Sequence, residues 1–251
     1  MNKLPRVTLL FWIMKIAATT LGETAGDLVS MTLKVGYAVS SMILIGLFLV
    51  SLVTQLRSTR YHPALYWTVI LSTSTAGTTM SDYMDRTLGL GYAKGALMLA
   101  AMLTAIFVYW RSTAHSFSIQ HIRTFKGELL YWTAILFSNT LGTALGDFLA
   151  DDSGLGFAGG ALLIAGLLAL TAFAMLSTRI SKTLLFWMAF VLTRPFGATM
   201  GDVLTKSTEK GGLNFGTIGS SVILGGILVM LILYTTLYPQ KEPRAVANVG
   251  C

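Results

Sequence analysis

The feature that most constrains this chain is a four-fold internal repeat centred on an aspartate. In each copy an aromatic residue followed by tryptophan precedes the aspartate by sixteen positions, and a glycine precedes it by five. The four aspartates are Asp27, Asp82, Asp147 and Asp202, and the four glycines are Gly22, Gly77, Gly142 and Gly197. An ionisable side chain that recurs at one depth of apolar segments is costly to place in a bilayer, so it predicts a functional site.

The composition predicts an integral membrane protein. Hydrophobic residues make up 54% of the chain, charged residues make up 12%, and the mean hydropathy is +0.68. Almost uncharged windows of about twenty residues, long enough to span a bilayer, occur at 36–56, 91–110, 156–176 and 213–237. Each alternates with a weaker window that carries an aspartate. We therefore predict an all-α membrane domain over residues 1–251, with eight transmembrane helices in four parallel two-helix repeats at about 8–57, 63–112, 128–178 and 183–238.

The distribution of charge predicts the orientation of the chain. Both tails and the loops between repeats hold eleven of the Lys and Arg residues, whereas the turns inside the repeats hold five. The positive-inside rule then places both termini in the cytoplasm and the aspartates towards the outer half of the membrane. This distribution accounts for the net charge of +7 without a nucleic-acid partner. The single cysteine, Cys251, is the last residue, which excludes an internal disulfide or a thiolate metal site.

Polar residues recur at fixed distances before each aspartate. Positions four, seven and eight residues earlier lie on the same face of a helix as the aspartate, so each copy carries a polar stripe. The candidate supporting residues on these stripes are Thr19, Ser74, Thr78, Asn139 and Thr143. Taken singly, such hydroxyls and amides are equally typical of helix packing in membranes.

Three charged residues make the repeats unequal. Glu23 lies four residues before Asp27, so the two carboxylates face one way and suit a proton or a shared cation. Lys15 and Arg194 fall inside predicted aspartate helices and are candidate charge partners or gates, although a snorkelling lysine and a structural ion pair are the plainer interpretations. Pro195 favours a broken helix in the last copy. We expect two unlike half-sites, Asp27 with Glu23 and Asp202 with Arg194.

The repeated Gly-x4-Asp pattern, and above all the run from Thr193 to Asp202, resembles a family of bacterial multi-pass inner-membrane proteins described as uncharacterised membrane-anchored proteins. The resemblance covers nearly the whole chain. It implies a bacterial inner membrane, and it implies no activity.

Function must therefore be argued from the residues. Clustered carboxylates with hydroxyl and amide oxygens form a hard oxygen site that suits Mg²⁺, Mn²⁺ or Ca²⁺. The favoured hypothesis is a secondary transporter of a divalent metal cation, with Mn²⁺ or Mg²⁺ preferred and export one direction open to it. Asp27, Asp82, Asp147 and Asp202 would be the metal ligands, and these four with Glu23 would form the ion and proton site.

In this hypothesis the divalent cation is the substrate, and no other cofactor is expected. The expected partners are the lipid bilayer, the metal ion and protons; small residues on the return helices would also allow a homodimer. Two alternatives stay open. One is a membrane-embedded enzyme that acts on a lipid or a lipid-linked phosphate, with Mg²⁺ bridging carboxylates and phosphate. The other is a scaffold or sensor subunit whose aspartates pair with basic residues of a partner.

Overall fold

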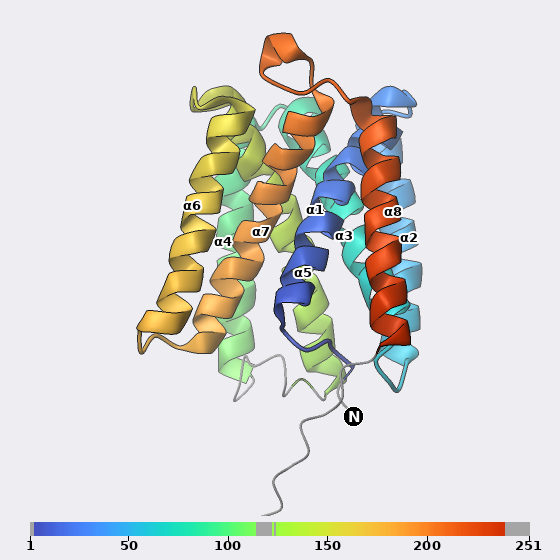
Figure 1. The fold of residues 1–251 in the computed structure, drawn as a ribbon, viewed down its shortest axis with the longest axis vertical. Coiled ribbons are helices and arrows are strands. Elements are labelled where there is room, and N and C mark those ends of the chain that lie inside the picture. The colour runs from blue at the N-terminus through green and yellow to red at the C-terminus, as the bar shows by residue number, and fades with distance from the viewer. Residues whose placement is uncertain (1–2, 114–121, 123, 239–251) are drawn as a thin grey trace, which may run out of the picture.

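The computed structural model describes residues 3–113, 122 and 124–238, and this part of the chain is all helical, with eight long α-helices (Figure 1). The prediction of an all-α chain with eight long helices is confirmed. Four helices carry the aspartates: α1 (Leu9–Asp27), α3 (Pro63–Asp82), α5 (Phe125–Asp147) and α7 (Lys182–Thr205). Four return helices alternate with them: α2 (Tyr37–Arg57), α4 (Tyr92–Thr113), α6 (Gly156–Ser177) and α8 (Gly216–Leu237).

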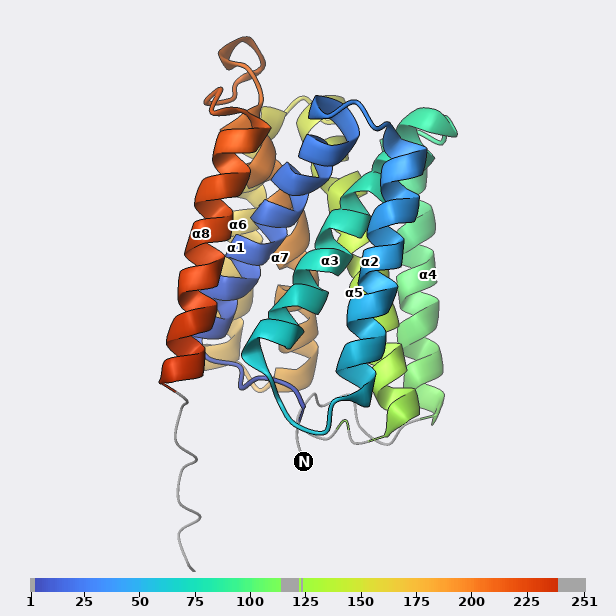
Figure 2. The same cartoon turned by 90° about the vertical axis from the view of Figure 1, so that its right-hand side faces the viewer.

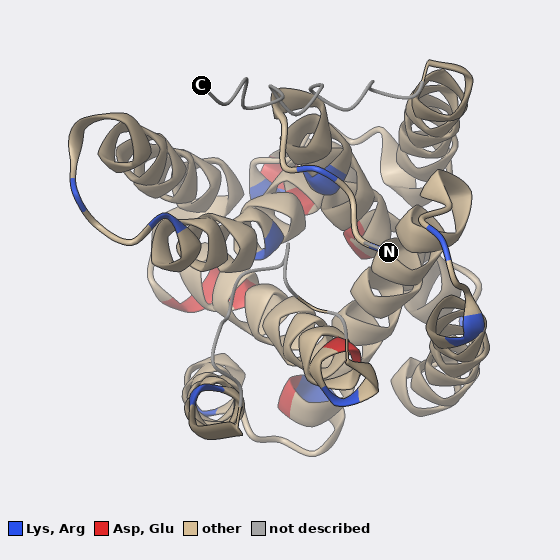
Figure 3. Cartoon of the chain, turned by 90° about the horizontal axis from the view of Figure 1, so that it is seen from below, with Lys and Arg blue, Asp and Glu red and all other residues tan. Residues whose placement is uncertain are grey.

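The helices form two concentric rings. The aspartate helices pack in the closed order α1, α3, α5, α7 and back to α1, and they make the inner ring (Figures 1 and 2). Each return helix packs mainly on the inner helix of the following repeat: α2 on α3, α4 on α5, α6 on α7, and α8 on α1. Seen along the bundle axis, the inner helices surround a common centre (Figure 3). Because every repeat covers its neighbour, the four copies fold as one closed unit and not as four hairpins.

Glycines allow the inner helices to approach each other closely. The glycine five residues before each aspartate faces the residue eight before the aspartate of the next copy, as Gly77 faces Asn139. A Cβ atom on Gly77 would lie 2.9 Å from the backbone nitrogen of Thr140 and 3.0 Å from the Asn139 Cβ. The same pairing joins Gly22 to Ser74, Gly142 to Arg194 and Gly197 to Thr19. Small residues at such crossings let backbones pack tightly, which explains why this glycine occurs in all four copies.

Aromatic residues close the ring at the beginning of the inner helices. Each tryptophan of the repeated pair packs on the aromatic residue of the preceding copy: Phe11 on Trp67, Tyr66 on Trp132, Tyr131 on Trp187 and Phe186 on Trp12, with ring centroids 5.5–6.0 Å apart. Aromatic pairs in tilted or edge-on arrangements stabilise a core beyond their buried area. The repeated aromatic–Trp pair thus forms the same kind of contact at all four interfaces of the inner ring.

The α-helical part of three inner helices ends at the aspartate. The chain then continues as a short π-helix: η1 (Leu28–Thr32), η2 (Tyr83–Thr87) and η4 (Phe148–Asp152). The wider turn is visible in backbone bonds such as Leu33 N to Leu28 O, at 2.8 Å. Such π segments occur often at functional sites, and here they directly follow Asp27, Asp82 and Asp147.

The fourth inner helix behaves differently. We expected Pro195 to break it, and this expectation is wrong: α7 is a continuous helix from Lys182 to Thr205. The hydroxyl of Thr19 on α1 donates to the Thr193 carbonyl at 3.2 Å, so a neighbouring helix supports the backbone beside the proline.

The outer surface of the bundle is apolar. Five helices are long and apolar enough to cross a membrane, namely α2, α4, α6, α7 and α8. They leave large side chains uncovered, such as Leu162 (74% exposed) and Leu176 (89% exposed) on α6. Helices α1, α3 and α5 fall below the same limit because their polar stripes lower their hydropathy. The bundle is therefore polar along its axis and apolar outside, the reverse of a water-soluble helical bundle.

Candidate cation-binding site

The four inner helices run in the same direction, so equivalent residues of the four repeats lie at one level of the bundle axis. The repeated aspartates lie at the level where α1, α3 and α5 end, and Asp202 lies there on α7, which continues to Thr205. All four are buried, with exposed fractions of 2–4%. The ring therefore gathers Asp27, Asp82, Asp147 and Asp202 at one end of the bundle.

Arg86 bridges two of these aspartates. It lies four residues after Asp82 in η2, and its Nε is 3.0 Å from Asp82 Oδ1. Its Nη2 is 3.5 Å from Asp147 Oδ2 on the next inner helix. Its Nη1 donates to the Tyr37 hydroxyl at 3.2 Å, and the rings of Tyr37 and Tyr92 lie 5.8 and 5.7 Å from the guanidinium carbon. Two carboxylates, a hydroxyl and two aromatic faces thus hold this guanidinium in place.

Lys206 bridges the other two aspartates. It lies four residues after Asp202, and its Nζ is 3.0 Å from Asp202 Oδ1 and 2.8 Å from Asp27 Oδ2. Burial lowers the pKa of Lys206, but the carboxylates of Asp202 and Asp27 outweigh burial and raise it above its ordinary value. Burial likewise lowers the pKa of Arg86, but the carboxylates of Asp82 and Asp147 raise it by more. The pKa of Arg86 therefore also lies above its ordinary value. Both bridging side chains are therefore cations at neutral pH.

The next level of the axis contains a buried ion pair. Arg194 Nη1 donates to Glu23 Oε2 at 2.9 Å, and both side chains are almost fully buried. Arg194 Nη2 donates to the hydroxyls of Thr78 and Thr143 at 2.6 and 2.7 Å, and the two hydroxyls lie 3.2 Å from Glu23 Oε2. All four inner helices contribute to this network, because Glu23, Thr78, Thr143 and Arg194 each come from a different repeat. A buried ion pair needs such additional hydrogen bonds to offset its desolvation.

Three carboxylates of the cluster approach closely enough to share one ion. Glu23, Asp147 and Asp202 each offer one oxygen atom, and these atoms all lie within 4.8 Å of one another. The three residues are buried and come from three different repeats. An all-oxygen donor set of this kind fits a hard divalent cation such as Mg²⁺, Ca²⁺ or Mn²⁺.

The polar axis ends below the ion pair. Lys15 is fully buried, and its Nζ lies 4.2 Å from the centre of the Phe190 ring, with no hydrogen-bond partner among the described residues. Ile70 and Ile135 are also fully buried on α3 and α5, one turn before Ser74 and Asn139. Beyond Ile70 and Ile135 lie the packed aromatic residues at the beginning of the inner helices. Along the axis, the carboxylates are thus closed off on the side of the aromatic residues.

The structure brings together most of the residues that the sequence singled out. The four aspartates and Glu23 lie in one buried cluster, and Thr78 and Thr143 contact both partners of the ion pair. Ser74 contributes its carbonyl, 3.3 Å from Arg194 Nη2. Asn139 and Thr19 act elsewhere: Asn139 Nδ2 donates to the Thr73 hydroxyl at 2.8 Å, and Thr19 supports α7.

The expected half-sites are wrong in one respect. Arg194 pairs with Glu23 and not with Asp202, because its side chain reaches Glu23 on the neighbouring inner helix α1. Asp202 and Asp27 instead share Lys206. Lys15, a candidate charge partner, contacts an aromatic ring and forms no ion pair in the described part of the chain.

Sequence reasoning missed Arg86 and Lys206 as members of the site. It assigned both residues to outer turns, although a signal was present: each lies four residues after its aspartate. An acidic residue followed by a basic one at this spacing is typical of an intrahelical ion pair.

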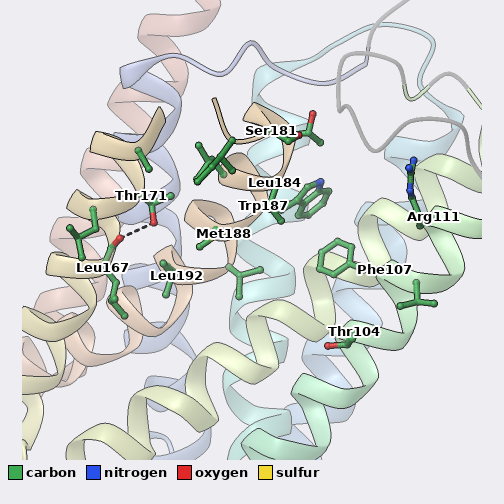
Figure 4. A pocket seen from close by; sticks show the side chains of 17 residues that line it. Thr104, Phe107, Arg111, Leu167, Thr171, Ser181, Leu184, Trp187, Met188 and Leu192 are labelled. Atoms are coloured by element: carbon green, nitrogen blue, oxygen red, sulfur yellow. Dashed lines mark hydrogen bonds between the residues drawn. The ribbon is translucent and has the colours of Figure 1, made fainter. Parts of the chain in front are cut away.

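A large cavity of the described chain is separate from this cluster. It is an apolar groove of about 1290 Å³ between α4, α6 and α7, lined by side chains such as Phe107, Leu167, Leu184 and Met188 (Figure 4). Arg111 is its one charged lining residue, and none of the clustered carboxylates reaches it. The groove suits an apolar occupant, whereas the axis suits a charged one.

The fold and the site define a class: an all-helical ring of four repeats that encloses buried, paired charges. Comparison with protein families agrees with the four repeats, because one family model matches residues 10–61, 65–116, 130–181 and 185–239. The chain belongs to this family, the Repeat of Unknown Function (DUF347). No curated protein and no solved structure matches the chain.

Proposed function

We propose that this protein is a secondary transporter of a divalent metal cation in the bacterial inner membrane, with all eight long helices embedded and both termini in the cytoplasm. The observation that carries the proposal is the group of three buried oxygens from Glu23, Asp147 and Asp202, within 4.8 Å of one another at the centre of the ring. Buried carboxylates in a membrane domain are retained at high energetic cost, and they mark ion or proton pathways.

The balance of charge supports a cation as the substrate. Five carboxylates lie on the axis, and three cations pair with them: Arg86, Arg194 and Lys206. With every one of these groups ionised, the cluster carries two net negative charges. A buried net charge is unfavourable in a medium of low dielectric constant, so the cluster should attract either a proton or another cation. Protons and metal ions would then compete for the same carboxylates, which is the basis of proton-coupled exchange.

The two ends of the axis support a transport cycle. The side chains of Lys206 and Arg86 are 21% and 29% exposed, whereas Tyr66, Trp67, Tyr131 and Trp132 are at most 1% exposed. In the proposed orientation the cluster communicates with the outer side and the aromatic ring closes the cytoplasmic side. Alternating access would require that ring to open while the other end closes.

Cation flux into proteoliposomes tests the proposal. We expect saturable uptake of Mn²⁺ or Mg²⁺, with a matching change of internal pH, and loss of both in Asp147→Asn and Asp202→Asn. Asp152→Asn is the matched control, because Asp152 is an exposed aspartate in η4 and should leave flux unchanged. Absence of flux for Mn²⁺, Mg²⁺ and Ca²⁺ in well-folded wild-type protein would refute the proposal. Turnover of a labelled lipid phosphate by that protein would support the enzymatic alternative.

A further inference from the structure

We propose that Lys206 is a tethered cation that occupies the substrate site between transport events and is displaced by the incoming metal ion, while Arg86 stays in place. This inference rests on the proposed cation transport and adds a mechanism of competition to it. The class of ligand is a divalent metal cation, and the group that it displaces is the ammonium of Lys206.

The position of Lys206 allows displacement. Its ammonium sits on Asp202, one of the three carboxylates that approach within 4.8 Å, and on Asp27 beside it. A metal ion bound to Asp202 would therefore compete directly with Lys206 for the same carboxylate. The Lys206 backbone is held by bonds from its own N to Asp202 O and from Asn214 N to its O, at 2.9 and 3.0 Å. The side chain is 21% exposed, so the ammonium can swing to solvent while the backbone stays fixed.

Arg86 has more contacts than Lys206, and this difference indicates that Lys206 is the cation that is displaced. Its guanidinium also bridges two aspartates, but it has the Tyr37 hydroxyl and the rings of Tyr37 and Tyr92 as further partners. Its contact to Asp147, the member of the three-carboxylate group, is the longer one at 3.5 Å. Moving Arg86 would break all these contacts, whereas moving Lys206 breaks two. A lysine ammonium is also a compact point charge on a flexible stem, the better mimic of a small cation.

Charge balance favours the exchange. The cluster carries two net negative charges with Lys206 in place and three with Lys206 withdrawn. A divalent cation that takes the place of the ammonium therefore lowers the net negative charge of the cluster to one. When the ion leaves, the return of Lys206 prevents Asp27 and Asp202 from facing each other as bare carboxylates. The lysine would thus lower the affinity for the ion and speed its release.

Binding measurements on purified full-length protein test this mechanism. We expect Lys206→Gln to bind Mn²⁺ at least about tenfold more tightly than wild type by isothermal titration, because the intramolecular competitor is gone. Its maximal flux in proteoliposomes should fall, because release slows. Lys210→Gln, at an exposed lysine of the same loop, should change neither value. Equal or weaker Mn²⁺ binding by folded Lys206→Gln would overturn the inference.

A second measurement follows the ammonium itself in the wild-type protein. Acetylation of Lys206 by an amine reagent, followed by mass spectrometry, should rise severalfold when Mn²⁺ is added, with exposed Lys210 as the internal reference. No rise at Mn²⁺ concentrations that saturate binding would overturn the displacement even if transport is real. If neither wild type nor Lys206→Gln binds or transports any of the three cations, both the proposed function and this inference fall.

Discussion

The two ends of the inner ring are built by the same four repeats, yet they differ in how far the repeats agree. At the aromatic end the four copies are nearly equivalent: Phe11, Tyr66, Tyr131 and Phe186 each pack on a neighbouring tryptophan. Four residues before the aspartates, at the other end, the copies carry Glu23, Thr78, Thr143 and Ala198. Four residues after the aspartates they carry Met31, Arg86, Asp151 and Lys206.

This difference separates the residues that close the ring from the residues that form the charged cluster. A ring closes most readily when every interface is the same, so the aromatic level and the glycine contacts repeat. A binding centre needs unlike groups, because four identical carboxylates facing one another would repel. Single changes in individual copies supply the cations and the fifth carboxylate. Four predictions test this division, and they run from the largest expected effect to the smallest.

The largest effect is expected at the unequal end, at Arg194. Arg194→Gln should leave Glu23 buried without its cation and lower the free energy of unfolding by about 3–5 kcal/mol. The readout is the thermal unfolding temperature of the purified protein in detergent. Glu23→Gln alone should also destabilise, whereas the double variant Glu23→Gln/Arg194→Gln should recover most of the loss, since it removes both charges. Additive losses in the double variant would show that the two residues act independently.

At the repeated contacts, the effect should depend on the approach of backbones. Gly77→Ala would place a Cβ 2.9 Å from the Thr140 nitrogen, and we expect a loss of about 1–3 kcal/mol. Gly46→Ala is the matched control, because Gly46 lies in helix α2 with open space around its Cβ position. It should be neutral or slightly stabilising, given the higher helix propensity of alanine. Equal unfolding temperatures for the two variants would contradict the close-packing role of the repeated glycine.

The sequence predicted the features that repeat and missed those that depend on how repeats meet. The spacing of Asp27, Asp82, Asp147 and Asp202 was enough to predict four copies and eight helices, because hydropathy and helical periodicity are local properties. The partner of Arg194 was not local: its side chain reaches a carboxylate on another helix, and helical periodicity defines a face without defining which helix lies against it.

The packing of each return helix on the next repeat could not be predicted from the sequence either. By hydropathy alone, any apolar helix could cover any inner helix. Arg86 and Lys206 were assigned to solvent-exposed turns, because a hydropathy value treats every charged residue as polar whether or not it has an ion-pair partner. The i,i+4 spacing to the preceding aspartate would have returned both to the site.

A smaller effect is expected at the aromatic end. The hydroxyls of Tyr66 and Tyr131 are hydrogen-bonded to each other at 2.7 Å, and both residues are fully buried. Tyr66→Phe should cost about 1 kcal/mol, because the Tyr131 hydroxyl then lacks its partner. Tyr66→Phe/Tyr131→Phe should be close to wild type, since copies one and four already carry Phe11 and Phe186 at this level. A double variant less stable than either single variant would show that the hydroxyl pair has a role beyond closure.

The smallest effect concerns a charge that only one copy carries, three residues after its aspartate. Burial raises the pKa of Asp85 from 3.8 to about 6, although the Ser81 hydroxyl, 3.2 Å from its Oδ2, acts in the opposite sense. A carboxyl whose pKa is higher in the folded protein binds its proton more tightly there. Its contribution to stability is therefore fully present below pH 4 and is lost as the pH rises towards 6.

Asp85→Asn keeps the shape of the side chain and removes this titration. The difference in unfolding temperature between Asp85→Asn and wild type should therefore grow in favour of the variant from pH 4 to pH 6 and stay constant above pH 7. Asp152→Asn, at an exposed turn of copy three, should show no such trend. A difference that is flat from pH 4 to pH 7 would mean that Asp85 is as well solvated in the folded protein as in the unfolded chain. The unequal end of the ring would then hold one buried acid fewer.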